Sequence, residues 1–358
     1  MPSPIPVSSR HATGIHELTA SYKALDIINR PVHCWVHTPA GERWRSFGSR
    51  RARRICLRHR VESVADIGPA AGLSHDRTVL VGLLGKGIQL SRTPAMHEAE
   101  GRALGIPYVY RLLDTDCMSA ATDVADILRF AEDFGFSGLN VTFPYKQDVV
   151  PLLDELSPAA RSIGSVNTVV FRDGRRFGHN TDMWGFAESF RRGLPGVPRR
   201  HVLMIGAGGA GAAVAHALLE SGVERLSIAD TDTDRAQALA LKLSGFFGEG
   251  RCQASPAADI AGSVDGIVNA TPVGMAKVPG MPIDPDQIGA GTWVADIIYF
   301  PLETEFLRVA RAKGCRTLSG EGMALFQAVR AFELFAGVKP DTDRMRAAFV
   351  AFADATAG

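Results

Sequence analysis

Short apolar runs alternate with longer amphipathic or alanine-rich stretches from residue 78 to the end of the chain. The short runs are typical of buried strands, and the longer stretches are typical of helices. The pattern predicts strands at residues 78–84, 108–113, 138–142, 162–170, 201–205, 225–229, 266–269, 293–298 and 315–318. It predicts helices at residues 121–134, from 149 onward, after 185, and at 209–221, 234–244, 302–313, 324–335 and 341–355. Repeated alternation of strand and helix indicates an α/β fold.

One predicted strand-to-helix turn is rich in glycine. Four apolar residues, 202–205, lead into a G-x-G-x-x-G motif, and an alanine-rich helix follows directly. Such glycines allow a tight turn, a close approach of backbone to a pyrophosphate, and tight packing of helix on strand, and the helix N-terminus offers N–H groups to phosphates. We therefore expect a dinucleotide to bind along Gly206, Ala207, Gly208, Gly209, Ala210 and Gly211. A glycine-rich turn without a ligand is the alternative, and the lack of a following Gly-Lys-Ser/Thr argues against a triphosphate-binding loop.

Length and turn residues suggest how the chain is divided. A chain of 358 residues favours two domains, and the Gly- and Pro-containing stretch 193–200 is typical of a linker. We expect an α/β domain at 78–190, a Rossmann dinucleotide-binding domain at 191–319, and helices at 320–358 that pack back on the first domain, with the active site in the cleft between the domains. Residues 1–77 lack the alternating pattern, and we expect them to form a poorly ordered extension.

An acidic cluster follows the second strand of the dinucleotide unit. Asp230 lies 24 positions after Gly206, close to the spacing at which an acid binds the adenosine ribose of NAD. Asp232 and Asp234 are next to it, and three carboxylates would repel the 2′-phosphate of NADP, with Arg235 as the one nearby cation. The sequence favours NAD, with Asp230, Asp232 and Arg235 as cofactor contacts. The alternative is that the aspartates only cap the following helix.

Lys146 and Asp182 are candidates for proton transfer. Oxidation of a secondary alcohol removes a hydroxyl proton as hydride leaves for nicotinamide. A lysine could take that proton if its pKa were lowered, or its ammonium could polarise the oxygen while a carboxylate takes part. Each residue could also be an ordinary surface residue in a turn. Ser91 and Thr93 precede a helix that takes Pro94 in its first turn, so they either bind a polar ligand or serve as turn and N-cap residues.

Charge is unevenly distributed along the chain. The net charge is +1, but residues 1–77 carry twelve Lys/Arg against six Asp/Glu, and eight arginines fall in residues 43–60. This stretch could bind nucleic acid, or it could be a poorly ordered tail or upstream sequence translated from an early start codon. No nucleic-acid-binding motif accompanies it, so we expect no nucleic-acid partner.

Cysteine usage and hydropathy indicate a cytoplasmic protein. The five cysteines are scattered without C-x-x-C spacing, which argues against a disulfide framework and against a metal site. No apolar run reaches the roughly 18 residues that span a bilayer, and the N-terminus lacks the features of a secretory signal. We therefore expect no metal and no membrane partner.

Taken together, these motifs resemble the shikimate dehydrogenase family over most of residues 79–335. The matching segments are Leu90-Ser-Arg-Thr-Pro, Asn140-Val-Thr-Phe-Pro-Tyr-Lys146, Val166-Asn167-Thr, Asn180-Thr-Asp182, the glycine loop, Asn269-Ala-Thr-Pro-Val-Gly, Tyr299 and Gly320-Glu-Gly-Met-Ala-Leu-Phe-Gln327. The resemblance implies that Lys146 and Asp182 form a catalytic dyad. It implies a polyol pocket lined by Ser91, Thr93, Thr142, Lys146, Asn167, Asp182, Tyr299 and Gln327. It also implies cofactor contacts from Asn269, Thr271 and Pro272, with Gly320 and Met323 beside the nicotinamide.

Two departures refine this resemblance. The common NADP form of the family has Asn-Arg-Thr where this chain has Asp230-Thr231-Asp232, and the second serine of its substrate loop is Thr93 here. Both departures resemble the NAD-dependent quinate/shikimate dehydrogenases of the family. The implied activity is reversible NAD-dependent oxidation of quinate, shikimate or both to the 3-dehydro ketone, by a monomer or homodimer. The alternatives are an NADP-dependent biosynthetic shikimate dehydrogenase, a related dehydrogenase with another substrate, and a non-catalytic homologue that senses a polyol or a nucleotide.

Overall fold

The structure is a computed structural model that describes residues 32–38, 41–47, 78–118 and 123–355. The chain divides into two compact units, residues 1–73 and 74–358. In the first unit, strands β1 (Val32–Thr38) and β2 (Gly41–Phe47) pair as an antiparallel hairpin with Thr38 opposite Gly41. Most of the predicted extension at 1–77, including most of the arginine-rich stretch, lies outside the described residues.

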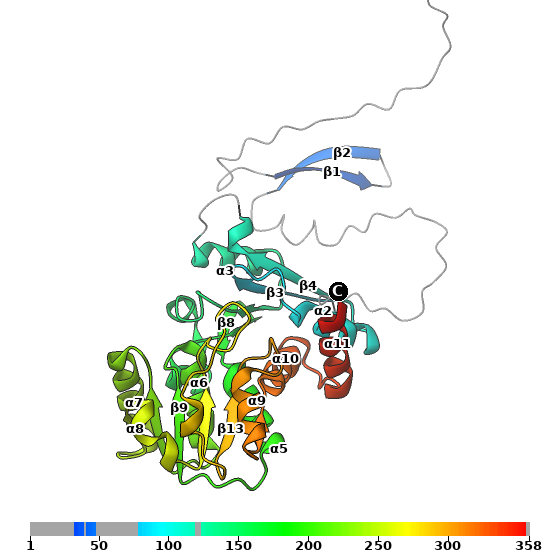
Figure 1. Ribbon diagram of the computed structural model, residues 1–358. Coiled ribbons are helices and arrows are strands. Elements are labelled where there is room, and N and C mark those ends of the chain that lie inside the picture. Colours follow the sequence, from blue (N-terminus) through cyan, green and yellow to red (C-terminus); the bar gives the residue numbers. More distant parts are fainter. Residues whose placement is uncertain (1–31, 39–40, 48–77, 119–122, 356–358) are drawn as a thin grey trace, which may run out of the picture. The chain divides into compact units, whose positions relative to one another are not determined.

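The second unit contains two six-stranded sheets (Figure 1). The first has the order β4-β3-β5-β7-β8-β6. Its strands are β3 (Val79–Gly85), β4 (Tyr108–Asp114), β5 (Gly138–Val141), β6 (Glu155–Leu156), β7 (Thr168–Arg172) and β8 (Arg175–His179). Strands β3, β4 and β5 are parallel, whereas β7 runs antiparallel to both β5 and β8. The carboxyl ends of β3, β4, β5 and β8 therefore meet at one edge of the sheet.

Four helices belong to this first domain. They are α2 (Thr93–Ala103), α3 (Val124–Asp133), α4 (Pro158–Ile163) and α5 (Thr181–Gly193). Helix α3 is amphipathic and buries Ile127, Leu128 and Ala131 against the sheet, in a core shared with Leu139 and Val141 of β5. The predicted hairpin turn at 172–175 is confirmed, because Asp173 and Gly174 both have positive φ, 52° and 70°.

The second sheet is entirely parallel, with the order β11-β10-β9-β12-β13-β14. Numbered within this domain the order is 3-2-1-4-5-6, the Rossmann arrangement. Its strands are β9 (His201–Ile205), β10 (Arg225–Ala229), β11 (Cys252–Ala254), β12 (Gly266–Asn269), β13 (Trp293–Asp296) and β14 (Thr317–Leu318). Its helices are α6 (Gly209–Glu220), α7 (Thr233–Phe247), α8 (Ala257–Ile260) and α9 (Glu305–Ala312). The predicted Rossmann domain and α/β fold class are confirmed.

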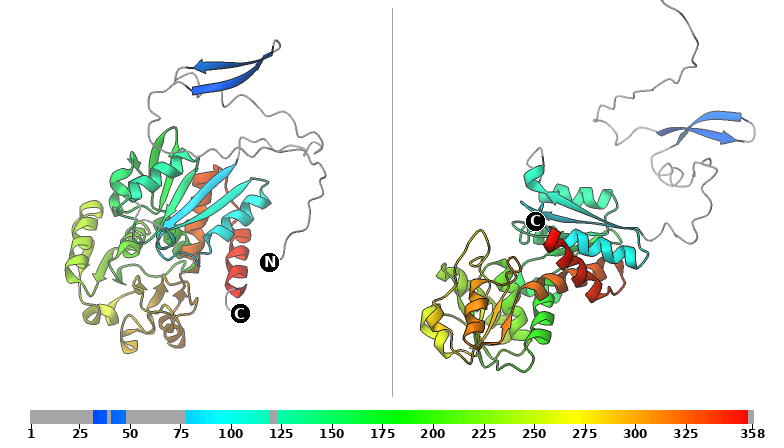
Figure 2. Two further views of the ribbon diagram at one scale, coloured as in Figure 1. Left: turned by 90° about the horizontal axis from the view of Figure 1, so that it is seen from above. Right: turned by 45° about the vertical axis from the view of Figure 1, so that its right-hand side comes forward.

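The chain ends in α10 (Glu321–Ala336) and α11 (Thr342–Ala355). Helix α10 lies along α5, and α11 lies beside α2, which belongs to the first domain (Figure 2). Their apolar residues, among them Phe332 and Phe349, share one core with Val81 of β3 and Tyr110 of β4. The first domain is therefore completed by the end of the chain.

Several predicted elements are wrong in detail. Residues 149–156 do not form a helix but a 3₁₀ turn, Val150–Leu152, followed by the short strand β6. Leu153 adopts an extended backbone, with a φ of −106° and a ψ of 143°, which ends the turn. Residues 162–170 are not one strand, because α4 begins after the Ser157 cap and ends at Gly164 with a φ of 75°. Thr93 is not an N-cap; it is the first residue of α2, and Arg92 occupies the cap position.

No helix within the described residues has both the length and the apolar character needed to cross a membrane.

Candidate active site

Lys146 and Asp182 form an ion pair. The Lys146 Nζ lies 2.6 Å from Asp182 Oδ2, and the two side chains are 22% and 11% exposed. Lys146 follows β5 and Asp182 follows β8, so the shared edge of the first sheet brings them together across 36 residues of sequence. Asp182 lies in the first turn of α5, where the positive end of the helix dipole favours a carboxylate. This pair can hold and transfer a proton at a partly exposed position.

A buried hydrogen-bond network fixes the segment that carries Asp182. The Asn167 Oδ1 accepts the Thr181 N–H at 2.7 Å, and its Nδ2 donates to Thr181 Oγ1 at 3.0 Å. Asn140 donates to the Asn167 carbonyl and to Thr168 Oγ1, and it accepts from the Tyr110 hydroxyl. Asn180 caps α5 through the Met183 N–H. Asn140 of β5, Thr168 of β7 and Asn167 directly before β7 thus position the start of α5.

A loop after β3 carries Ser91 and leads to Thr93, the first residue of α2, and the Ser91 Oγ accepts the Thr93 N–H at 3.4 Å. Asp114, at the end of β4, accepts hydrogen bonds from the Gly87 and Ile88 N–H groups and from Gln89 Nε2. The bond from Gln89, with those from the backbone N–H groups, lowers the pKa of Asp114 against the opposing effect of burial. Asp114 therefore holds the loop as an ionised acceptor.

The same loop lies against Thr142. A Cβ on Gly85 would stand 2.4 Å from Thr142 Cγ2, and the Lys86 N–H donates to the Phe143 carbonyl at 3.0 Å. Glycine at position 85 is what allows this approach. The loop after β3 therefore begins beside Thr142, one of the predicted polyol contacts.

The glycine loop has the features of a phosphate cradle. A Cβ on Gly211 would lie 2.1 Å from the Gly206 carbonyl oxygen, and Gly206 has a φ of 104°, so neither position accepts a side chain. At Gly208, a Cβ would meet nothing within 4 Å, so this glycine leaves open space. Helix α6 has no side-chain cap and no acidic residue in its first turn. These residues fit a dinucleotide pyrophosphate.

Asp230 is tied to the glycine loop. Its Oδ2 accepts the Ala207 N–H at 2.7 Å, and its Oδ1 accepts the Asp232 N–H. Burial opposes ionisation of Asp230, but these hydrogen bonds outweigh it, and the pKa of the carboxyl is below its ordinary value. Arg235 contacts Asp232 at 3.0 Å and Asp230 at 3.7 Å, and Asp232 also caps α7.

Asp296 joins two loops at the carboxyl edge of the second sheet. It accepts hydrogen bonds from Asn269, Thr304 and the Ile298 N–H, while burial raises the pKa of its carboxyl. Asn269 also accepts from the backbone and the hydroxyl of Thr271, in the segment that contains Pro272. The Gly320 N–H donates to the Ile298 carbonyl, and the buried Met323 follows within α10.

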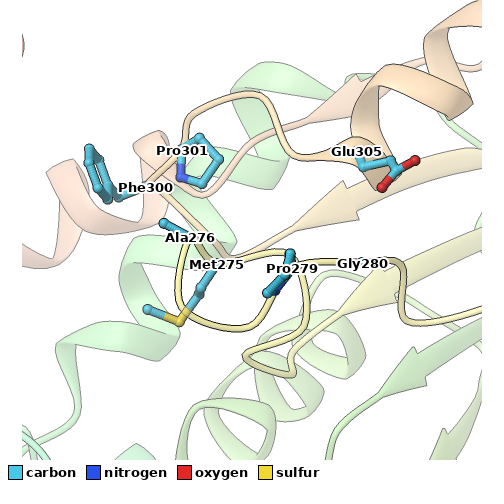
Figure 3. Close-up of a pocket in the computed structure, with 8 residues that line it drawn as sticks. Met275, Ala276, Pro279, Gly280, Phe300, Pro301 and Glu305 are labelled. Atoms are coloured by element: carbon cyan, nitrogen blue, oxygen red, sulfur yellow. The ribbon is translucent and has the colours of Figure 1, made fainter. Parts of the chain in front are cut away.

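Among the described residues, neither Tyr299 nor Gln327 makes a hydrogen bond with Lys146 or Asp182. Tyr299 is 47% exposed, with its ring 6.3 Å from that of Phe349, and Gln327 donates to the Ala324 carbonyl. A cavity of about 300 Å³ lies nearby, between the loop after β12 and the segment after β13 (Figure 3). Its lining is Gly274, Met275, Ala276, Pro279, Gly280, Phe300, Pro301 and Glu305, so it adjoins Tyr299 and does not include Lys146 or Asp182.

Asp114, Asn140 and Asp296 are supporting residues that the sequence analysis did not single out as site residues. Asp114 and Asp296 each end a parallel strand, and an acid at that place is a signal that could have been used. No group of three or more His, Cys, Asp or Glu side chains within the described ranges could hold a metal ion.

Three segments of the chain match models of known protein families. Residues 83–169 match the shikimate dehydrogenase substrate binding domain. Residues 189–271 match the shikimate / quinate 5-dehydrogenase family, and residues 320–348 match the shikimate 5′-dehydrogenase C-terminal domain.

Individual relatives are similar over nearly their whole length. The chain is 53% identical over 272 residues to a shikimate dehydrogenase (NADP(+)) of Streptomyces avermitilis, spanning 75% of this chain and 94% of that protein. It is 49% identical over 283 residues to a quinate/shikimate dehydrogenase (NAD(+)) of Corynebacterium efficiens, spanning 78% and 99%. A solved quinate dehydrogenase from Corynebacterium glutamicum in complex with NAD superposes with a TM-score of 0.75 at 48% identity, spanning 76% of this chain and 99% of that one. The chain therefore belongs to the shikimate/quinate dehydrogenase family.

Proposed function

We propose that the protein is an NAD-dependent quinate/shikimate dehydrogenase, with Lys146 and Asp182 as its proton-transfer pair. The observation that carries the proposal is the 2.6 Å contact between Lys146 Nζ and Asp182 Oδ2, in the same compact unit as a Rossmann domain. Pairing a proton-transfer group with a dinucleotide fold is what oxidation of an alcohol requires.

Substrate binding and proton transfer would fall to different residues of this chain. Ser91, Thr93, Thr142 and Asn167 would hold the hydroxyl and carboxylate groups of the ring, with Tyr299 and Gln327 contributing from the other domain and the last helices. During oxidation, the reacting hydroxyl gives its proton to the Lys146–Asp182 pair, and during reduction the pair returns it. The bound nicotinamide would supply the hydride acceptor or donor.

The cofactor contacts favour NAD. Asp230 presents an ionised carboxylate beside the glycine loop, where an acid would accept hydrogen bonds from ribose hydroxyls. The 2′-phosphate of NADP would be repelled by Asp230 and Asp232. It would also have to compete with both carboxylates for the guanidinium of Arg235. Thr231 stands where the common NADP form of the family has an arginine. Gly208 to Gly211 would hold the pyrophosphate, and Asn269, Thr271, Pro272, Gly320 and Met323 would flank the nicotinamide end.

An exchange at Asp230 tests the cofactor assignment. Asp230→Asn keeps an acceptor for the Ala207 N–H but removes the charge, so we expect kcat/KM with NAD to fall about tenfold or more and kcat/KM with NADP to fall less or rise. The matched control is Asp343→Asn, which removes an exposed charge from the first turn of α11. Equal losses with both cofactors would remove Asp230 from the ribose contact.

Steady-state kinetics of the purified protein test the function itself. Quinate and shikimate are each assayed with NAD and with NADP. Turnover of at least one acid with NAD, more efficient than with NADP, is the expected result. Preference for NADP and shikimate would favour the biosynthetic alternative, consistent with the NADP-named relative from Streptomyces avermitilis. Ligand binding without turnover would favour a sensing protein. A cytoplasmic monomer or homodimer remains our expectation.

A further inference from the structure

Arg92 is a buried arginine in the loop predicted to hold the substrate. It lies between Ser91 and Thr93 and is only 9% exposed. Its guanidinium carbon is 5.4 Å from the ring centroid of Phe300 and 5.1 Å from that of Phe349. The guanidinium is thus held between a ring that follows β13 and a ring of α11.

This guanidinium has no acceptor among the described residues. Its Nη1 is fully buried without a hydrogen-bond partner, and no carboxylate of the described chain lies within ion-pair distance. Other arginines of the structure are paired, such as Arg176 with Glu132 and Arg344 with Glu100. Aromatic faces attract a cation but accept no conventional hydrogen bond, so a buried guanidinium held only by rings still lacks an anion.

A second source of positive potential lies at the same place. Arg92 is the N-cap residue of the eleven-residue helix α2, which has no side-chain cap and no acidic residue in its first turn. The N-terminal end of a helix favours negative charge. The Phe349 ring that stacks with Arg92 also lies 6.3 Å from the ring of Tyr299, a predicted polyol contact. The uncompensated charge is therefore next to residues that the proposed function uses.

We propose that Arg92 is a specificity-determining residue that selects substrates with a carboxylate on the polyol ring. Its guanidinium, together with the N-terminus of α2, supplies the counter-charge for that carboxylate. This inference rests on the proposed function and deepens it, because quinate and shikimate both carry a carboxylate. Arginine suits the position because its flat guanidinium can stack between two rings and still donate at its edge.

The test compares an acid with its neutral ester. Whichever of quinate and shikimate turns over faster is assayed beside its methyl ester, with wild type, Arg92→Gln and Arg92→Lys. We expect wild type to prefer the acid by about tenfold or more in kcat/KM, the scale of one charge-assisted hydrogen bond. Arg92→Gln should lose this preference through a higher KM for the acid, with kcat and the ester kinetics nearly unchanged. Arg92→Lys should restore part of it.

Arg102→Gln is the matched control, because Arg102 is exposed in the last turn of the same helix. It should keep the wild-type preference. Equal losses for acid and ester in Arg92→Gln would show a role limited to stacking and would overturn the proposal. Equal kcat/KM for acid and ester in wild type would overturn it without any variant, so a folding defect cannot hide the answer. If wild type turns over neither acid, it is the proposed function that fails.

Discussion

At the scale of single residues, the proton-transfer pair makes the sharpest prediction. Lys146→Ala removes the group that would exchange the hydroxyl proton but few groups that would hold the ring. We expect kcat to fall by about 10²- to 10⁴-fold, with substrate affinity changed little. Steady-state kinetics and a direct binding titration measure the two effects separately. Lys339→Ala, at an exposed position after α10, is the control, and near-normal turnover in Lys146→Ala would exclude the dyad.

The two residues of the ion pair are easier to find from the sequence than Arg92. Lys146 and Asp182 belong to recognisable motifs, and their strands end at one edge of a sheet, so a pattern could predict both. Arg92 looks like any arginine in a loop. Its significance depends on which rings and carboxylates come near it, and Phe300 and Phe349 lie more than two hundred residues away in sequence. Pairing of this kind is a tertiary property that no local pattern contains.

At the scale of elements, two glycines between β9 and α6 have different roles: Gly211 is needed for stability, and Gly208 is expected to be needed for NAD binding. A Cβ on Gly211 would strike the Gly206 carbonyl oxygen, so Gly211→Ala must push the helix from the strand, at a cost of about 1–3 kcal/mol in the free energy of unfolding. Gly208→Ala meets no protein atom but would crowd a pyrophosphate, so NAD affinity should fall while Tm stays unchanged. Thermal unfolding and an NAD titration measure the two effects. Gly245→Ala, at a position of α7 with open space around it, is the control and should change neither NAD affinity nor fold. Equal changes in Tm and in NAD affinity for all three variants would contradict these separate roles.

Element boundaries were predicted well only where the local signals agreed. From β9 to α6, the signals are an apolar strand, a glycine-rich turn and a long run of residues with high helix propensity. The observed bounds of both elements differ by at most one residue from those predicted. Between residues 149 and 170 the signals conflict. Apolar residues there serve a 3₁₀ turn, a two-residue strand, a short helix and the start of β7, all packed on one core. Tertiary packing decides among such short elements, which is why sequence reasoning merged them.

At the scale of the whole molecule, His97 links stability to pH. It is fully buried among Tyr108, Tyr110 and Phe332, and burial lowers its pKa to about 3. Below its ordinary pKa of 6.5, the unfolded chain binds a proton that the folded chain refuses until about pH 3. The free energy of unfolding should therefore fall as pH drops through this window, by up to about 1.4 kcal/mol per pH unit.

His97→Phe isolates this contribution. The substitution has a cost of its own, because the Tyr108 hydroxyl loses a partner at 2.8 Å, but that cost does not vary across the window. The other histidines are the same in both proteins, so the difference between the two slopes belongs to His97. We expect the Tm of wild type to drop more between pH 7 and pH 5 than the Tm of the variant. Parallel curves would mean that His97 does not titrate as its burial requires.

The return of α10 and α11 to the first domain has a consequence for synthesis on the ribosome. One core of that domain combines Val79 and Val81 with Phe332, Met345 and Phe349, so it cannot close until α11 has been translated. One core of the Rossmann domain is built entirely from the continuous stretch between Leu203 and Cys315, which emerges earlier. The nascent chain can thus close this Rossmann core, and the core around Leu139 and Val141 of β5, before α10 and α11 emerge. Only the face of the first sheet that carries Val79 and Val81 waits for these two helices.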